Sequence, residues 1–180
     1  MQTLSEADRL ITSERLRLPI LDLEQLDRIA AGEIGAVATQ LEIRLSAEWL
    51  EAVRWLAGMR ARQLRDRPQD AAWLIRPIVR ADTREAIGYL NFHAGPDDQG
   101  MVEIGYTLLP TARGQGYALE AVRAALDWAR RVRQIRHFRA SVAPDNERSL
   151  KLIGKLGFVQ TGEQWDPEDG LEHVFELTVD

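Results

Sequence analysis

The hydrophobic period of the sequence changes near Pro68, and this change limits the folds that the chain can adopt. Before it, apolar residues across 46–67 recur at the spacing of a helix, with Ser46 as a plausible N-cap. Pro68 ends this helix, because the residue before a proline disfavours helical backbone. Short alternating runs follow and predict three strands, at 73–79, 87–93 and 102–109. Because short turns join them, the strands should form an antiparallel meander, and Pro77 argues against a central place for the first.

The second half of the chain alternates between helical and strand-like segments. We expect helices at 116–132 and 146–156 and strands at 138–142, 158–161 and 173–179, after an early strand at 15–20 and an early helix at 22–31. This order predicts a mixed α/β sheet (α+β) with crossover helices in its second half. No repeat or linker is visible, so residues 1–180 should form a single domain.

Composition excludes several classes of protein. The sequence has no cysteine, which excludes a disulfide-framed scaffold, a thiolate zinc site and a cysteine nucleophile. The net charge of −5 argues against nucleic-acid binding. We also find no secretory signal and no apolar run long enough for a membrane span, so a cytoplasmic protein is expected. The three histidines are far apart in sequence, and no metal site is expected.

The segment 102–121 indicates chemistry, because it predicts a strand, a glycine-containing turn and a helix in succession. In the turn, Gly114 and Gly116 allow close approach of a ligand to the backbone. Successive N–H groups at the start of a helix bind anions such as a pyrophosphate. A tight turn without a ligand is the alternative. A Walker loop is excluded because no Gly-Lys-Ser/Thr ending exists, and Leu119 replaces the third glycine of a dinucleotide loop.

Two motifs resemble those of the GNAT superfamily of N-acetyltransferases. Arg113-x-x-Gly116-x-Ala118 is similar to the Q/R-x-x-G-x-G/A signature of its cofactor loop. Downstream, Asn146 opens a helix that ends in Gly157-Phe158, as in the second motif of that superfamily. The surrounding sequence (E-I-G-Y, R-G-Q-G-Y-A, N-x-x-S) is most similar to that of the branch that contains the ribosomal-protein N-terminal acetyltransferases. The resemblance implies a GNAT-like fold and acetyl-CoA as cosubstrate.

The resemblance also implies where acetyl-CoA binds. The strand 103–109 should splay from the strand 138–142, and pantetheine should lie in the gap, paired with the backbone near Tyr106 and Leu108. The pyrophosphate should contact the backbone of Arg113, Gly114, Gln115, Gly116, Tyr117 and Ala118. Asn146 matches a position whose side chain contacts the cofactor, and an N-cap role is its alternative or additional function.

Catalytic residues are implied less directly. A tyrosine often lies seven residues after the asparagine in this superfamily, but here that position is Ile153. Ser149 matches a serine of the resembling branch and could hydrogen-bond the departing sulfur, or it could bond only to the helix backbone. Glu103 could relay a proton from the amine through water, or it could pair with a nearby arginine. Glu172 and His173 are weaker candidates for the base.

The acceptor implied by the resemblance is a primary amine that attacks directly in a ternary complex. It could be the N-terminal α-amine of a protein or a small amine such as an amino acid or an antibiotic. A non-catalytic acetyl-CoA-binding module is the other alternative. Residues 160–180 contain seven acidic residues and no Lys or Arg, which would attract a cationic amine, although such runs are often only solvated.

Three further expectations concern the surroundings of the site. Residues 113–139 contain seven arginines against two acidic residues, which suits a phosphate-bearing cosubstrate. Trp49 and Trp55 lie in the helical region that walls the acceptor pocket in the superfamily. Edge strands could pair two copies of the chain, so a homodimer is also considered.

Overall fold

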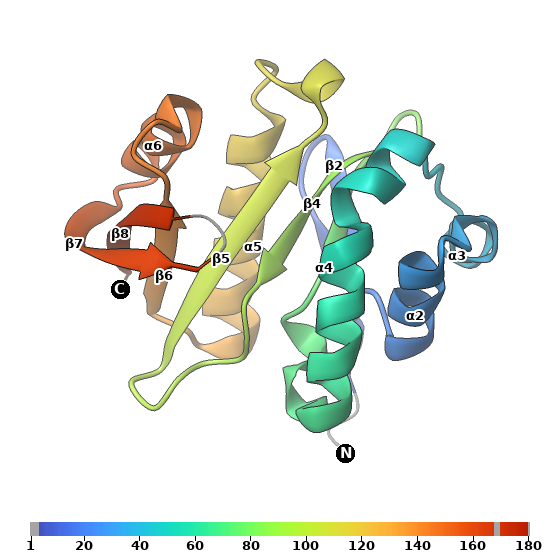
Figure 1. Cartoon of the computed structure of the whole chain (residues 1–180), viewed down its shortest axis with the longest axis horizontal. Helices are drawn as coiled ribbons and strands as arrows, with labels where there is room; N and C mark the ends of the chain where they lie inside the picture. The colour runs from blue at the N-terminus through green and yellow to red at the C-terminus, as the bar shows by residue number, and fades with distance from the viewer. Residues whose placement is uncertain (1–3, 168–169, 180) are drawn as a thin grey trace.

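The computed structural model describes residues 4–167 and 170–179, which build an eight-stranded mixed sheet flanked by helices (Figure 1). The strand order is β1-β2-β3-β4-β5-β6-β8-β7. The elements are α1 (Glu6–Arg9), β1 (Leu10–Thr12), β2 (Leu16–Pro19), α2 (Leu23–Ala31), α3 (Ile34–Leu41), α4 (Ala47–Asp66), η1 (Pro68–Ala72), β3 (Arg76–Arg80), β4 (Ala86–Phe92), β5 (Met101–Leu108), η2 (Pro110–Ala112), α5 (Tyr117–Arg133), β6 (His137–Val142), α6 (Glu147–Lys155), β7 (Val159–Asp166) and β8 (Gly170–Thr178).

The predicted meander is confirmed, because β3, β4 and β5 are antiparallel neighbours. Its first strand begins three residues later than expected, since 68–72 form a 3₁₀ helix and the Trp73 N–H bonds to the Asp70 carbonyl. The strand is also an inner one, contrary to the expectation from Pro77. β2 pairs with it only at Val79 and Arg80, so Pro77 interrupts no ladder bond on that side.

The N-terminal region contains more structure than the sequence pattern predicted. The two expected helices are present, and Ser46 accepts a hydrogen bond from the Trp49 N–H as the N-cap of α4. The helices α1 and α3 and the strand β1 were not predicted. They are short, and α3 includes Gly35 with β-branched Val37 and Thr39, which lower its intrinsic helix propensity.

Helices cover both faces of the sheet and create two hydrophobic cores. In Figure 1, α4 lies in front of the sheet with α2 and α3 beside it, and α5 lies behind. Adjacent strand residues point to opposite faces, so Ile78 packs in the core of α5 and Val79 in the core of α4. The helix α6 lies on the far side of β6 from α4.

The sheet opens between β5 and β6, as the resemblance implied. These strands pair in parallel from Met101 with His137 to Glu103 with Arg139. Beyond that point the two strands no longer pair with each other, and they continue to Leu108 and Val142. The opening faces the start of α5 and the start of α6, and it positions the site described next.

Candidate active site

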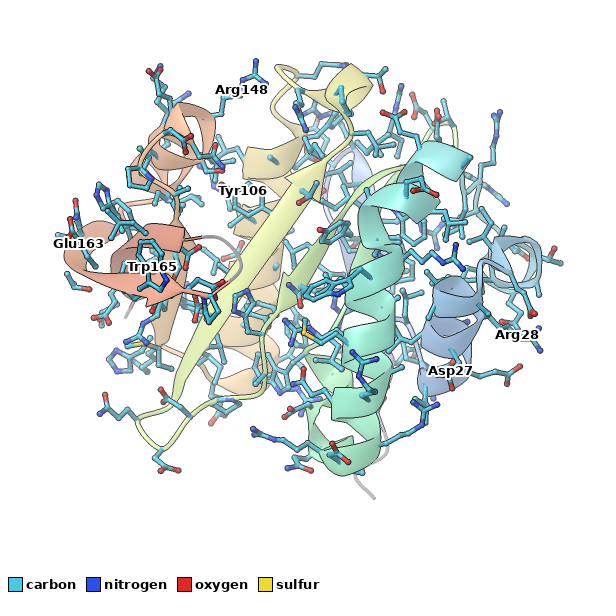
Figure 2. The ribbon with its side chains drawn as sticks, in the orientation of Figure 1. Asp27, Arg28, Tyr106, Arg148, Glu163 and Trp165 are labelled. Atoms are coloured by element: carbon cyan, nitrogen blue, oxygen red, sulfur yellow. The ribbon has the colours of Figure 1, made fainter. Side chains whose placement is uncertain are left out.

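A groove of about 1000 Å³ runs along the open end of β5, between the start of α5 and α6. Nine of the residues predicted from the sequence line it: Tyr106, Leu108, Arg113, Gly114, Gly116, Tyr117, Ala118, Asn146 and Ser149. Two predicted residues lie outside its lining. The Gln115 side chain bonds back to the Thr111 carbonyl, and Glu103 lies on the opposite face of the sheet. Figure 2 shows Tyr106 beside β5 on the side of α6, from which Arg148 extends.

The glycine loop gives the groove a set of free backbone N–H groups. Gly114 and Gly116 adopt left-handed backbone, with φ of 78° and 81°, which side chains disfavour. Gly116 is the N-cap of α5 and provides no side-chain cap, so the first amides of the helix remain available to a ligand. A helix start of this kind attracts an anion.

Positive charge in the groove comes mainly from α6. Arg148, Lys151 and Lys155 line it together with Arg113, whose Nε donates to the Leu108 carbonyl at 3.0 Å. The arginines of 113–139 were expected to serve this purpose. Several instead form ion pairs within the fold: Arg131 with Asp127, Arg133 with Asp8 and Arg139 with Glu176. The groove nevertheless combines cationic side chains with free amides, as a pyrophosphate requires.

Two residues at the start of α6 lie on the groove wall. Asn146 Oδ1 accepts a hydrogen bond from the Ser149 N–H at 3.2 Å, so Asn146 is an N-cap as well as a lining residue. Ser149 interacts with the phenol of Tyr106. The Tyr106 oxygen is buried and has no partner of good hydrogen-bond geometry among the described residues. Burial raises the pKa of Tyr106, and the imperfect contact with Ser149 opposes this only in part.

Glu103 lies at the apex of the opening, on the face of the sheet that α4 covers. Its neighbours Val102 and Ile104 pack in the core of α5, so Glu103 points the other way. The Ser141 hydroxyl donates to Glu103 Oε1 at 2.6 Å across the two strands, and His93 Nδ1 lies 3.7 Å from Oε2. The hydrogen-bond partner of Glu103 is therefore Ser141, and Arg60 of α4 is the nearby arginine with which its charge interacts.

A hydrogen-bonded network extends from Glu103 to the C-terminal hairpin. Gln164 donates to the Ser141 oxygen at 3.1 Å and to Glu172 Oε2 at 2.9 Å. His173, the other late candidate, pairs with Glu163 at 3.3 Å. Burial lowers the pKa of His93, although the Glu103 carboxylate opposes this. Sequence reasoning missed Ser141, Gln164 and His93, because they join this network only through tertiary contacts.

A clamp from the N-terminal strands holds the glycine loop. Glu120, in the first turn of α5, accepts hydrogen bonds from the Ser13 hydroxyl and the Arg15 N–H and forms an ion pair with Arg15 at 2.7 Å. Arg15 also donates to the Gln115 carbonyl and lies over the Tyr117 ring. Burial alone would raise the pKa of Glu120, but the bonds from Ser13 and Arg15 together outweigh it and lower the pKa.

The substitution Glu120→Gln is expected to lower the free energy of unfolding by about 1–2 kcal/mol at pH 7. Because the pKa of Glu120 is lowered, its charge stabilises the fold above the pKa of the unfolded chain and stops doing so as pH falls through the folded value. The two proteins should therefore converge in stability as the pH falls from about 4.3, the ordinary pKa of a glutamate, through the lower folded pKa of Glu120. Urea midpoints across this range test this, with Glu147→Gln in the exposed Glu147–Lys151 pair as control. A constant difference across this range would contradict it.

The two tryptophans predicted near the acceptor pocket have different surroundings. Trp49 is fully buried in the core of α4 and donates from Nε1 to the Gly88 carbonyl at 2.8 Å. Trp55 is 60% exposed on α4. Neither lines the groove, and Trp49 packs in the core beneath α4.

Across residues 4–167 and 170–179, no group of three or more His, Asp or Glu side chains is arranged to hold a metal ion. In this described part of the chain, every helix is too short or too polar to cross a bilayer.

Comparison with known proteins finds a matching family model and similar N-acetyltransferases. The family model described as an acetyltransferase (GNAT) domain matches residues 15–159. The uncharacterized N-acetyltransferase YjdG of Bacillus subtilis is 29% identical over 155 residues, covering 83% of this chain and 89% of YjdG. The [ribosomal protein uS5]-alanine N-acetyltransferase of Escherichia coli is 32% identical over 82 residues, 45% of this chain and 42% of that protein.

A solved structure of RimL, the ribosomal L7/L12 α-N-protein acetyltransferase in complex with coenzyme A, has a similar fold. It superposes with a TM-score of 0.65 at 20% identity and covers 95% of this chain and 98% of its own. At this identity the likeness concerns the fold alone.

Proposed function

The chain belongs to the GNAT family of acetyltransferases, and from this premise we propose that it transfers an acetyl group from acetyl-CoA to the N-terminal α-amine of a protein. The observation that carries the proposal is the groove, where free amides of α5 face cationic side chains of α6 beside an opened strand. Acetyl-CoA supplies the activated acetyl group when it is bound there. Residues of this chain bind the cosubstrate and accept the proton of the amine.

The residues of the groove fit the parts of acetyl-CoA. The amides of 114–118 would hold the pyrophosphate, because the Arg113 N–H already donates to the Pro110 carbonyl, and Arg148 and Lys151 would neutralise its charge. Beyond Glu103, β5 has no paired neighbour on the β6 side, so its backbone groups near Tyr106 and Leu108 are free to bond the pantetheine amides. Asn146 and Ser149 would lie near the thioester end.

The amine would approach from the face that carries Glu103. A carboxylate at the apex of the opening can accept a proton from the attacking amine through a water molecule, and the hydrogen bond from Ser141 holds it in place. Direct attack in a ternary complex is supported by this arrangement, because the groove and the carboxylate lie on opposite faces of the same opening.

The C-terminal hairpin favours a cationic acceptor. Glu163, Asp166, Glu172 and Glu176 are the acidic residues of β7 and β8, and the strands contain no Lys or Arg. The other acidic residues counted in 160–180 (Glu168, Asp169 and Asp180) lie outside the described residues. An acidic surface of this kind attracts the ammonium group of an amine before it loses its proton. The name of one similar protein, the [ribosomal protein uS5]-alanine N-acetyltransferase of Escherichia coli, favours a protein acceptor over a small amine.

A thiol-release assay with matched peptides tests the proposal. We expect acetyl-CoA-dependent release of thiol with peptides that begin with alanine or serine, and none with the same peptides acetylated at the N-terminus. Mass spectrometry should locate the acetyl group on the α-amine rather than on a lysine side chain. Turnover with free amino acids or aminoglycosides and none with peptides would overturn the protein acceptor in favour of a small amine.

A further inference from the structure

The phenol of Tyr106 is a buried polar group that the fold itself leaves unsatisfied. Its oxygen is shielded from water and has no partner of good geometry in the described residues. Such a group costs free energy, and in a native structure it calls for an explanation. Tyr106 also lines the groove, so the explanation concerns the site rather than the core.

The neighbour of this phenol is the hydroxyl of Ser149. The two side chains come from different elements, β5 and α6, and meet at the wall of the groove. A serine hydroxyl has one hydrogen to donate and can accept in return, whereas a protonated phenol can donate to it. Because burial raises the pKa of Tyr106, the phenol keeps its proton at neutral pH.

We propose that Tyr106 is a positioning residue: when the acetyl donor occupies the groove, its phenol donates a hydrogen bond to Ser149 Oγ and so directs the Ser149 hydrogen toward the donor's sulfur. This inference rests on the proposed binding of acetyl-CoA in the groove. The isoleucine at 153 makes such a role necessary. It is 1% exposed in the core and offers no hydroxyl from the next turn of α6. Ser149 then needs orientation from another element.

The effect of this orientation follows from the reaction. The bond from the amine nitrogen to the acetyl carbon forms, the carbon–sulfur bond breaks, and the electron pair of the broken bond stays on sulfur. The proton lost by the amine passes to water or to Glu103, and the sulfur takes a proton from water. A hydrogen bond from Ser149 stabilises the sulfur only as it gains charge, so it affects turnover more than acetyl-CoA affinity.

Turnover in single and double variants tests the coupling of the two residues. In Tyr106→Phe, kcat should fall about tenfold, while acetyl-CoA affinity stays within about twofold. Ser149→Ala should lower kcat by a similar factor or more. In the double variant, the loss should equal that of Ser149→Ala alone, because Tyr106 acts through Ser149. Tyr89→Phe, on β4 against the core of α4, is the matched control and should leave kcat unchanged.

A second readout needs no acceptor and no turnover. The ultraviolet absorbance of the thiolate reports the pKa of the thiol in bound coenzyme A. An oriented Ser149 hydroxyl stabilises the thiolate, so this pKa should be about one unit higher in Tyr106→Phe than in the wild type. The thermal midpoint of the unliganded protein should stay the same or rise in Tyr106→Phe, because the substitution removes an unsatisfied hydroxyl.

The outcomes separate this inference from the function on which it rests. If Ser149→Ala changes the bound thiol pKa and Tyr106→Phe does not, the positioning role is wrong and the groove assignment stands. If Tyr106→Phe lowers kcat equally in the presence and absence of Ser149, the phenol acts independently and the inference is also overturned. If coenzyme A does not bind in the groove at all, both variants should behave as wild type, and the proposed function fails.

Discussion

Replacing Gly116 with leucine is expected to lower the affinity for acetyl-CoA at least about 100-fold, which corresponds to roughly 2.7 kcal/mol. Gly116 lines the groove and is the N-cap of α5, so a side chain there would occupy the space in front of the first helical amides. A Cβ at this position would meet only Arg15 of the protein, at 3.5 Å, which is an ordinary contact. The loss should therefore reflect exclusion of the ligand rather than collapse of the loop.

The control for this experiment is Gly100→Leu. Gly100 lies between β4 and β5, has φ of 75° and would have no atom within 4 Å of a Cβ. Both substitutions place a side chain in left-handed backbone and carry a similar strain of about 1 kcal/mol. Calorimetric titration should show wild-type affinity for Gly100→Leu alone. Equal affinities in the two variants would mean that the pyrophosphate does not bind at the glycine loop.

The glycine loop could be predicted from sequence because its determinants are local. The turn, its two glycines and the helix that follows occupy consecutive residues, and both glycines adopt left-handed backbone that other residues rarely take. Likewise, Asn146 stands directly before the helix that it caps. The order of strands and helices was predictable for the same reason, since each element has its own periodicity.

The other half of the site depends on contacts that sequence spacing does not encode. Ser141 reaches Glu103 across a parallel strand pair, and Gln164 joins them from an edge hairpin. The meeting of Tyr106 with Ser149 likewise depends on where β5 separates from β6. Charge counts were misleading as well, because three of the seven arginines of 113–139 form ion pairs within the fold while α6 provides most of the cations in the groove.

Arg76 has an environment that its local sequence pattern does not reveal. It is a charged residue in the alternating run 73–79, yet its side chain is fully buried. The guanidinium donates to the carbonyls of Asp8, Leu18 and Ala72, at 2.7, 3.1 and 3.0 Å. It also lies 4.9 Å from the ring centre of Trp128 on α5. Arg76 thus joins the N-terminal segment, β2 and the end of η1 beneath the helix that carries the glycine loop.

The substitution Arg76→Met should lower the free energy of unfolding by about 3–5 kcal/mol, because methionine fills much of the space but leaves the three carbonyls without this donor. Urea denaturation followed by circular dichroism measures the change. Arg80→Met, on the same strand, is the matched control and should leave the midpoint nearly unchanged, since Arg80 pairs with the exposed Asp82 at the surface. If Arg76→Met were as stable as the wild type, the cost of burying the guanidinium would equal the gain from its hydrogen bonds. The N-terminal segment would then be held by packing and by the Asp8–Arg133 pair alone.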